Sequence, residues 1–382
     1  MRVLIFAPSF WPAVKAGGPA RSLTNLARKA SQEHSVVVIA PDRDLGDVVP
    51  FPSKSLACGF EESVEIHYIN TGSPVALLTR YRTSMAEEFD VVLINSVWNW
   101  RFSLLPAVMR SIGLMRTDIL VLMPRGELYS GALALKSRKK RLARGLVKAV
   151  LRANVDLVAY TSESEALDLR EWFPMIPRVA VTNEPDVVRS GYSQREAVLR
   201  VLFLGRVHAT KGLFELLESL RYASEPILLQ IAGPADDLAY KRRCVESEAR
   251  LPECVKVKWL GPVSRTCVEN LLWASDLMVL LTAGENFGHV VAESLQAGCP
   301  VLITDETPWT EFIRAGAGEI VEDRNDFRTV GAALDRWSQL DQTALERYRE
   351  RATEAFDAWR LRNSGDVLAV TGDWMAKRDK RG

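Results

Sequence analysis

The sequence predicts an α/β protein made of two doubly wound parallel sheets. Short apolar, β-branched runs alternate with longer helical patterns along nearly the whole chain, which indicates βαβ units. The alternation is interrupted once, near residues 182–191, and then resumes. The chain has 382 residues, which is enough for two or three domains.

The first half contains six strand patterns and a clear first helix. Strands are expected at 2–7, 36–40, 64–69, 91–94, 119–123 and 157–160. Residues 19–33 predict a helix, because Leu23, Leu26, Ala27 and Ala30 fall on one face. Helical patterns separate most of the later strands, so the sheet should carry helices on both faces.

The second half repeats this organisation. Strands are expected at 201–204, 227–232, 255–260, 277–281 and 301–304, and helices at 212–222, 238–250, 264–274 and 288–297. Gly298 followed by Pro300 is typical of a helix end. Ligands of such sheets bind at the carboxyl ends of the strands, and we expect the site in a cleft between the two halves.

The domain boundaries follow from these patterns. We expect an N-terminal domain at 1–185, a linker at 186–198 and a C-terminal domain at 199–360. Residues 361–382 form a charged helical tail. They end a charged stretch, 340–382, in which Trp359 and Trp374 lie in helical patterns, so the tail should pack back on the body.

Composition excludes several classes of protein. With 49 basic and 48 acidic residues the net charge is +1, so no global field favours nucleic acid. The five cysteines include no CxxC pair and the four histidines no HExxH, which argues against a disulfide framework and a zinc site. We expect a reducing, cytoplasmic compartment, with no signal peptide and no membrane-spanning segment.

Two loops carry features suited to phosphate. Gly17 and Gly18 stand between the first strand and first helix, where the backbone and the helix N-terminus can approach an anion. A flexible turn is the alternative, and the absence of GxGxxG disfavours a nicotinamide oxidoreductase. In the second half, Arg206 and Lys211 flank a loop that could neutralise a diphosphate, or they are simply solvated cations.

The strongest candidate is the segment 284–293, which reads Gly-Glu-Asn-Phe-Gly-His-Val-Val-Ala-Glu. Glu285 closes a strand-end loop, and Glu293 lies about two turns into the next helix. One carboxylate can accept hydrogen bonds from sugar hydroxyls and the other from a vicinal diol such as a ribose. The alternative is a helix-start charge plus a surface glutamate. His289 either points into this site or packs against the sheet.

With these residues in place, the chain resembles the retaining glycosyltransferases of family 4 (group 1), which have the two-domain GT-B fold. The resemblance rests on Glu285-x7-Glu293 followed by Ala-Gly-Cys-Pro-Val at 297–301, on the two loops above, and on the order of elements along nearly the whole chain. Residues 124–128, Pro-Arg-Gly-Glu-Leu, resemble a segment of bacterial branches that build surface polysaccharides.

The resemblance implies a role for each matching residue. Glu285 would bind donor-sugar hydroxyls near the reacting centre, and Glu293 the ribose. Arg206 and Lys211 would neutralise the leaving diphosphate. Gly17 and Gly18 would approach the diphosphate from the first domain. Sugar and phosphate oxygens would be held by the backbone amides near Phe287, Gly288, His289 and Val290. Family members usually need no metal and no cofactor, because cations and helix ends replace them.

The sequence departs from the family at two points. Many members carry a histidine after the strand at 91–94, and here Asn95 stands in that place. Asparagine can donate and accept hydrogen bonds but cannot titrate, so a mechanism that needs an imidazole there is in doubt. The linker also lacks the usual Asn-Gly turn and reads Asn-Glu-Pro at 183–185.

Three further motifs have competing interpretations. Asp42-Arg-Asp44 matches the metal-binding DxD signature of the other glycosyltransferase fold, but we interpret it as a loop motif. Asp236 and Asp237 are interpreted as a helix-start charge pair. The segment Lys136–Arg152 has eight basic and no acidic residues interleaved with apolar ones. It is either a face for anionic lipid or the solvated side of a helix on the sheet.

The prediction from sequence is a cytoplasmic, peripherally membrane-associated retaining glycosyltransferase. It would move a sugar from a UDP- or GDP-linked donor to an acceptor hydroxyl, on a lipid-linked glycan in polysaccharide or lipopolysaccharide (O-antigen-type) assembly. Nucleic acid is not an expected partner. The alternatives are another GT-B enzyme, such as a sugar-nucleotide epimerase or a phosphorylase, and a GT-B subunit that binds without turnover. The donor base, the sugar, the acceptor and the oligomeric state do not follow from the sequence.

Overall fold

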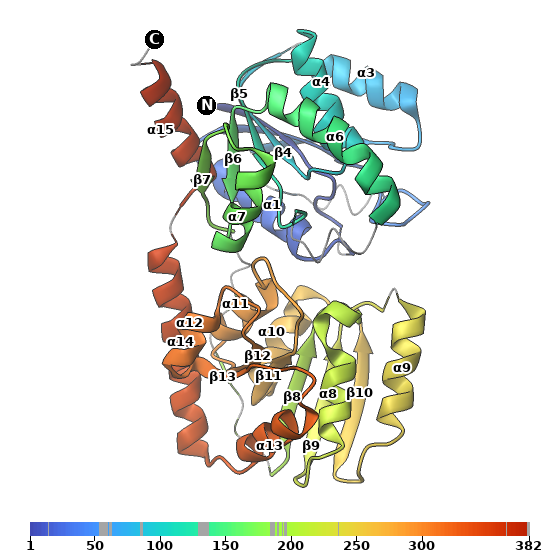
Figure 1. Cartoon of the computed structure of the whole chain (residues 1–382), viewed down its shortest axis with the longest axis vertical. Helices are drawn as coiled ribbons and strands as arrows, with labels where there is room; N and C mark the ends of the chain where they lie inside the picture. Colours follow the sequence, from blue (N-terminus) through green and yellow to red (C-terminus); the bar gives the residue numbers. More distant parts are fainter. Residues whose placement is uncertain are drawn as a thin grey trace. The chain divides into compact units, whose positions relative to one another are not determined.

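The structure is a computed structural model of the whole chain (Figure 1). It describes residues 1–13, 15–52, 60, 63–84, 87–128, 137–183, 188, 191–192, 194, 197–235, 237–363 and 365–379. The chain forms two compact units. The first comprises Met1–Pro185 and Ser364–Gly382, and the second comprises Asp186–Asn363.

The first unit is built on a parallel sheet of seven strands in the order β3-β2-β1-β4-β5-β6-β7. The strands are β1 (Arg2–Phe6), β2 (Ser35–Pro41), β3 (Val64–Ile69), β4 (Glu88–Asn95), β5 (Arg116–Met123), β6 (Leu157–Tyr160) and β7 (Arg178–Ala180). The central strands are buried on both faces, which explains their continuous apolar sequence. The register pairs Phe6 with Ile94 and Asn95 with Met123.

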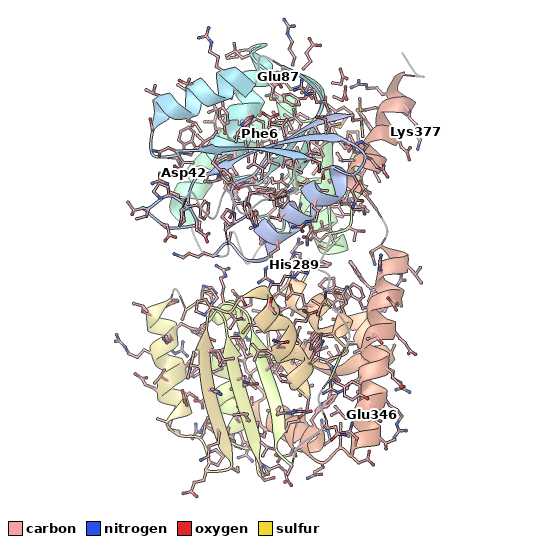
Figure 2. All side chains as sticks on the ribbon, turned by 180° about the vertical axis from the view of Figure 1, so that it is seen from behind. Phe6, Asp42, Glu87, His289, Glu346 and Lys377 are labelled. Carbon is pink, nitrogen blue, oxygen red and sulfur yellow. The ribbon has the colours of Figure 1, made fainter. Side chains whose placement is uncertain are left out.

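Helices cover both faces of this sheet (Figure 1). One face packs against α3 (Pro74–Ser84), the π-helical turn η1 (Trp100–Leu104), α4 (Leu105–Ser111), α6 (Ser137–Asn154) and α7 (Glu163–Trp172). The other face packs against α1 (Gly18–Ala30) and α15 (Val367–Asp379). Each face has its own apolar core. Phe6 belongs to the core on the α3–α7 face, and Figure 2 labels it within the sheet.

The second unit repeats the plan with six parallel strands in the order β10-β9-β8-β11-β12-β13. The strands are β8 (Leu199–Leu204), β9 (Ile227–Ala232), β10 (Val255–Gly261), β11 (Leu277–Leu280), β12 (Val301–Thr304) and β13 (Gly318–Val321). The helical elements are η2 (Ala209–Lys211), α8 (Leu213–Leu220), α9 (Leu238–Glu248), α10 (Arg265–Ala274), α11 (His289–Gln296), α12 (Thr310–Phe312), η3 (Ile313–Ala317), α13 (Phe327–Ser338) and α14 (Gln342–Arg362). One continuous core holds them together.

The predicted fold class, two doubly wound parallel α/β units, is confirmed. The helix expected at 19–33 ends earlier, at Ala30, because Ser31 and the turn after it close the helix. Gly298 has φ 75° directly after the C-cap of α11, so this helix end is confirmed. The short edge strands β7 and β13 and the π-turns η1 and η3 had not been expected.

The chain passes between the units twice, whereas the sequence predicted one linker. Of the predicted linker at 186–198, residues 188, 191–192, 194 and 197–198 are described, and they count with the second unit. The tail expected at 361–382 divides: α14 ends in the second unit at Arg362, and α15 belongs to the first. In the first unit, the Thr182 N–H donates to the Gly365 carbonyl at 2.7 Å. This bond joins the segment where the chain leaves the first unit to the segment where it returns.

Candidate active site

The strand order of the second sheet reverses between β8 and β11, which are neighbours although two strands separate them in sequence. At such a point the loops after the two strands run in opposite directions, and ligands of doubly wound sheets bind there. Lys211 follows β8 and Glu285 follows β11. The topology therefore brings the two predicted donor loops to one place.

Short backbone contacts join these two loops. The Thr210 carbonyl accepts from the Ala283 N–H at 2.8 Å and from the Thr282 hydroxyl at 2.9 Å. Gly212 has φ 76°, and a Cβ at this position would lie 1.9 Å from the Leu281 carbonyl oxygen. Only glycine permits both the left-handed backbone and this close approach.

Lys211 and Glu285 form an ion pair between the Lys211 Nζ and the Glu285 Oε1. Both side chains are largely buried, with 22% and 11% of their surface exposed. The Glu285 N–H donates to the Glu306 carbonyl at 2.9 Å, so the loop after β12 also fixes this residue. The pair places one cation and one carboxylate side by side at the carboxyl edge of the sheet.

Arg206 lies two residues beyond β8 and is exposed. It follows Gly205, which has φ 149°, and a Cβ on Gly233 would lie 1.9 Å from the Gly205 carbonyl oxygen. The loops after β8 and β9 are therefore in direct backbone contact. The Arg206 side chain lies on the surface of the second unit, where it can meet a ligand.

The start of α11 rests on an aromatic cluster. Gly288 is the N-cap with φ 77°, and the buried Phe287 precedes it. The Trp309 indole N–H donates to the Phe287 carbonyl. The rings of Trp309 and Trp359 lie 5.6 and 5.3 Å from the Phe287 ring. Trp359, noted in the sequence as a tail residue, thus supports this loop from α14.

The rest of the motif lies on α11. The first turn, at His289 and Val290, presents its N–H groups toward the N-terminal end of the helix. The His289 ring contacts the Phe287 ring edge-on at 4.6 Å and is half-buried, and Figure 2 labels it at one end of the second unit. Glu293 is 2% exposed, so the alternative of a surface glutamate is wrong.

In the first unit, the strand order reverses between β1 and β4. Gly17 follows β1 and is the N-cap of α1 with φ 64°, and Gly18 is the first residue of this helix. Asn95 ends β4, is 3% exposed, and donates from its amide to the Phe6 carbonyl at a long 3.4 Å. The predicted residues of this unit thus lie at the carboxyl edge of its own sheet.

A strained residue follows Asn95. Ser96 has φ 145°, a conformation that costs a non-glycine residue about 1–3 kcal/mol. Its hydroxyl donates to the Glu127 carboxylate at 2.9 Å, and the same carboxylate accepts from the Val97 N–H at 2.7 Å. In the sequence, the segment 124–128 is marked only by a resemblance. Its Glu127 in fact holds the turn after Asn95.

Arg125, also with positive φ (55°), belongs to the same segment. Its guanidinium donates to the Ser22 hydroxyl of α1 at 2.7 Å and to the Asn183 side chain. Burial lowers the pKa of Arg125 to about 10, against the opposing charge of Glu165. This residue, missed by sequence analysis, joins the start of α1 to the segment where the chain leaves the unit.

The DxD motif holds a loop. Asp42 pairs with Arg43 at 2.7 Å, and Asp44 accepts from the N–H groups of Lys15 and Leu45 at 3.1 and 2.7 Å. Within the described ranges, no three His, Cys, Asp or Glu side chains are grouped to hold a metal ion. Asp237 caps α9 by accepting from the Tyr240 N–H, as expected, whereas Asp236 lies outside the described residues.

The described apolar residues of the basic segment Lys136–Arg152 do not all face the core. Val147 and Leu151 on α6 are buried against the first sheet, while Leu146 is exposed. Arg144 and Lys148 lie over the ring of Trp172. Lys136 and the side chains at 138–141 lie outside the described residues. Of the helices described, none is both long and apolar enough to span a membrane.

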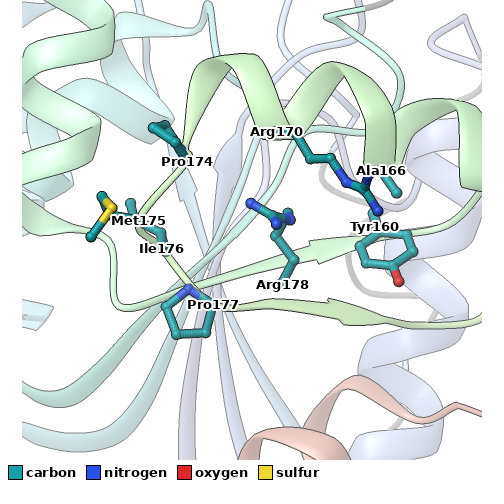
Figure 3. Close-up of a pocket in the computed structure, with 8 residues that line it drawn as sticks. All are labelled: Tyr160, Ala166, Arg170, Pro174, Met175, Ile176, Pro177 and Arg178. Atoms are coloured by element: carbon teal, nitrogen blue, oxygen red, sulfur yellow. The ribbon is translucent and has the colours of Figure 1, made fainter.

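The first unit has a surface pocket that contains none of the predicted site residues (Figure 3). Its volume is about 430 Å³, and its lining includes Arg170 of α7, Arg178 of β7 and Tyr160 of β6. Arg178 donates to the Phe173 carbonyl at 3.1 Å, so it complements the negative end of α7. No predicted site residue lines this pocket, and the Arg178 charge has a structural explanation.

Two family models match the chain, one on each unit. The model described as "Glycosyl transferase 4-like domain" matches residues 17–183, and the model described as "Glycosyl transferases group 1" matches residues 190–355. A D-inositol 3-phosphate glycosyltransferase of Corynebacterium urealyticum is 25% identical over 203 residues. That match covers 47% of this chain and 48% of the relative, about half the length of each.

Solved structures share the fold over the whole chain. HepE of Anabaena in complex with UDP and glucose superposes with a TM-score of 0.72, at 16% identity and 99% coverage of both chains. Sucrose-phosphate synthase of Thermosynechococcus elongatus gives 0.70 at 17% identity, covering 100% of this chain and 99% of that one. WaaG, a glycosyltransferase involved in lipopolysaccharide biosynthesis, gives 0.66 at 17% identity, with 97% and 98% covered.

Proposed function

Because this chain belongs to the group 1 glycosyltransferases of the family-4 type and has the GT-B fold, we propose that it transfers a sugar from a UDP- or GDP-linked donor to an acceptor hydroxyl with retention of configuration. The Lys211–Glu285 pair at the switch point of the second sheet carries this proposal. A cation for the diphosphate and a carboxylate for the sugar stand side by side, with the buried Glu293 on the helix that follows. HepE, solved with UDP-glucose, supports a nucleotide-sugar donor.

In the proposed reaction, the bond between the sugar and the diphosphate breaks as the acceptor oxygen attacks from the same face of the sugar, and the acceptor's hydroxyl proton passes to an oxygen of the departing diphosphate. Lys211 and Arg206 neutralise the charge that develops on the departing diphosphate. Glu285 accepts hydrogen bonds from donor-sugar hydroxyls and stabilises positive charge at the sugar ring. Glu293 accepts from the ribose hydroxyls, and the N–H groups at Phe287, Gly288, His289 and Val290 hold sugar and phosphate oxygens.

The Lys211–Glu285 ion pair has a consequence for binding. In this pair the two side chains neutralise each other. A bound diphosphate would then take over the lysine while sugar hydroxyls occupy the carboxylate. Donor binding therefore exchanges one internal ion pair for two contacts with the ligand. A free nucleoside diphosphate, which lacks the sugar, satisfies only the lysine.

The first unit supplies the remaining proposed contacts. Gly17 and Gly18 begin α1 without a side-chain cap, so the backbone of this turn is open to a diphosphate. Asn95 stands where an imidazole is common in the family, and we assign it hydrogen bonding to the donor sugar rather than proton transfer. We propose that neither a metal ion nor a cofactor takes part, since cations and helix N-termini supply the positive charge.

We further propose that the acceptor is a lipid-linked glycan in surface-polysaccharide assembly, at the cytoplasmic face of the membrane. WaaG, which shares the fold, is involved in lipopolysaccharide biosynthesis and supports this choice. The basic segment Lys136–Arg152 is the proposed membrane contact. Flotation of the chain with vesicles containing phosphatidylglycerol tests this part. Equal flotation with neutral vesicles, or none with either, would contradict it.

A thermal-shift panel tests the donor. The ligands are UDP, GDP, ADP and dTDP with their sugar conjugates, each with magnesium and with EDTA. A ligand that binds only the folded chain raises the melting temperature by mass action. We expect a shift with one nucleotide and no dependence on magnesium. Transfer of the matching sugar should then give a product with the donor's anomeric configuration, read by NMR.

Two variants and one control connect the result to the site. Lys211→Ala should lower turnover about 10²- to 10³-fold. Glu285→Gln should lower turnover but leave binding of the free nucleoside diphosphate equal or tighter, because Lys211 loses its internal partner. Lys256→Ala, on the exposed surface of β10, should change neither. No shift with any ligand would favour the non-catalytic subunit, and phosphate-dependent release of sugar phosphate would indicate a phosphorylase.

A further inference from the structure

Arg324 lies in the turn between β13 and α13, and its side chain is 20% exposed. Its Nη1 donates to the Leu281 carbonyl at 3.2 Å, and its Nη2 donates to the Ala209 carbonyl at 3.2 Å. It also pairs with the Glu215 carboxylate. One guanidinium thus contacts three separate segments.

The two carbonyls belong to the loops that carry the proposed donor residues. Ala209 begins η2, which ends at Lys211. Leu281 follows β11 and lies four residues before Glu285. We propose that Arg324 is a positioning residue of the donor site, which holds these two loops in one arrangement; the inference rests on the proposed function for its effect on turnover.

The carboxylate partner is itself fixed. Glu215 lies in the first turn of α8 and is 8% exposed. Its second oxygen accepts from the Tyr240 hydroxyl at a long 3.5 Å, and this hydroxyl accepts from the Phe214 N–H at 2.9 Å. Because Tyr240 comes from α9, the carboxylate that pairs with the guanidinium is anchored on α8 and contacted from α9. The guanidinium cannot follow a displaced loop without breaking these contacts.

The chemistry of arginine suits this role better than that of lysine. A planar guanidinium directs several N–H groups along fixed directions, so it can bridge two carbonyls and a carboxylate at once. A lysine ammonium keeps the charge but lacks the fork. Arg324→Lys therefore retains the pair with Glu215 and loses at least one carbonyl contact, whereas Arg324→Met loses them all.

A purely structural arginine would give a different result. It would stabilise the second unit as a whole, and its loss would lower the melting temperature without a selective effect on the two loops. A positioning residue acts locally. Its removal should loosen residues 205–212 and 281–288 together, and it should reduce the effect of removing Lys211, whose alignment depends on it.

Hydrogen–deuterium exchange of the ligand-free full chain tests the brace without reference to any substrate. We compare wild type, Arg324→Lys, Arg324→Met and the control Arg336→Met, which breaks a more exposed pair with Glu319. Arg324→Met should speed exchange in both loops about tenfold or more. Arg324→Lys should fall between it and wild type, and Arg336→Met should match wild type. Unchanged loops, or uniform acceleration over the whole second unit, would overturn the inference.

Release of UDP from UDP-glucose measures the catalytic effect. Arg324→Met should lower kcat about 10- to 100-fold with a smaller change in KM, since misaligned groups fail mainly in the transition state. In the double variant with Lys211→Ala, the lysine effect should shrink, and full additivity would contradict positioning. If wild type neither binds nor consumes a nucleotide sugar, the proposed function fails, whereas the exchange result still decides whether Arg324 braces the loops.

Discussion

Gly212→Ala is the substitution with the most direct structural consequence for the proposed donor site. Gly212 lies between η2 and α8 with φ 76°, and it approaches the Leu281 backbone at the point where the two donor loops meet. A methyl group here would overlap the Leu281 carbonyl oxygen at 1.9 Å and its carbonyl carbon at 2.6 Å. Neither atom is a flexible side-chain end, so one loop must move.

Two contributions determine the size of the effect. The left-handed backbone costs an alanine about 1–2 kcal/mol relative to a right-handed one. Ordinary contact begins at 3.4 Å, so the overlap requires a shift of about 1.5 Å. Overpacking of this kind costs roughly 1–3 kcal/mol. The expected loss is therefore about 2–5 kcal/mol in the free energy of unfolding.

Gly261→Ala isolates the second contribution. Gly261 ends β10 in the same unit with φ 67°, but a Cβ there meets nothing within 4 Å. Gly261→Ala should lower the free energy of unfolding only by the cost of the left-handed backbone, about 1–2 kcal/mol. Labelling of the buried Cys299 across a urea series reports unfolding of this unit alone, since its thiol is inaccessible in the folded unit. Equal losses for the two variants would refute the overlap argument.

The same pair of variants bears on binding. If the loops after β8 and β11 must touch to align Lys211 with Glu285, folded Gly212→Ala should bind the nucleotide identified for wild type at least tenfold more weakly. Gly261→Ala should bind it normally. Wild-type affinity in Gly212→Ala would show that the contact stabilises the fold but does not shape the site.

Two further outcomes are expected. Burial raises the pKa of Cys299 to about 11, so at pH 8 only about one thiol in a thousand is ionised. Iodoacetamide should therefore label the exposed Cys267 before Cys299 in the folded chain, as read by peptide mass spectrometry. Equal labelling rates for the two thiols would contradict the burial of Cys299. Asp276 is fully buried between Arg200 and Arg349. Asp276→Asn should therefore lower the free energy of unfolding by about 3–5 kcal/mol in the same urea series. A loss below about 1 kcal/mol would show that the two arginines need no buried counter-charge.

The alternation of strand and helix predicted most of the fold because burial on both faces leaves a direct signal in the sequence. The strands at 64–69, 157–160, 227–232 and 301–304 have the expected bounds. The edge strands β7 and β13 gave no such signal, since they are short and only partly buried. The π-turn at Trp100–Leu104 is held by the Asn99 side chain, a detail that periodicity does not report.

The candidate site was predictable to a similar extent. Glu285 and Glu293 belong to one sequence motif after β11, and Lys211 lies in the loop after β8. Parallel topology places the ends of β8 and β11 together, so these loops could be expected to meet. Arg324 and the Ser96–Glu127 contact were not predictable. Each depends on hydrogen bonds between segments far apart in sequence. Most arginines and serines are solvated surface residues, so residue type alone does not single out the few that bridge segments.

The residues that carry the proposed chemistry are therefore different from those that set its geometry. Lys211 and Glu285 supply charge, but glycines at 212 and 233 allow the loops to approach, and Arg324 fixes them. A change in charge should alter turnover with the loops intact. A change in the support should alter the loops first and turnover as a consequence. Measuring exchange and turnover on the same variants separates these effects, because only the support variants move both.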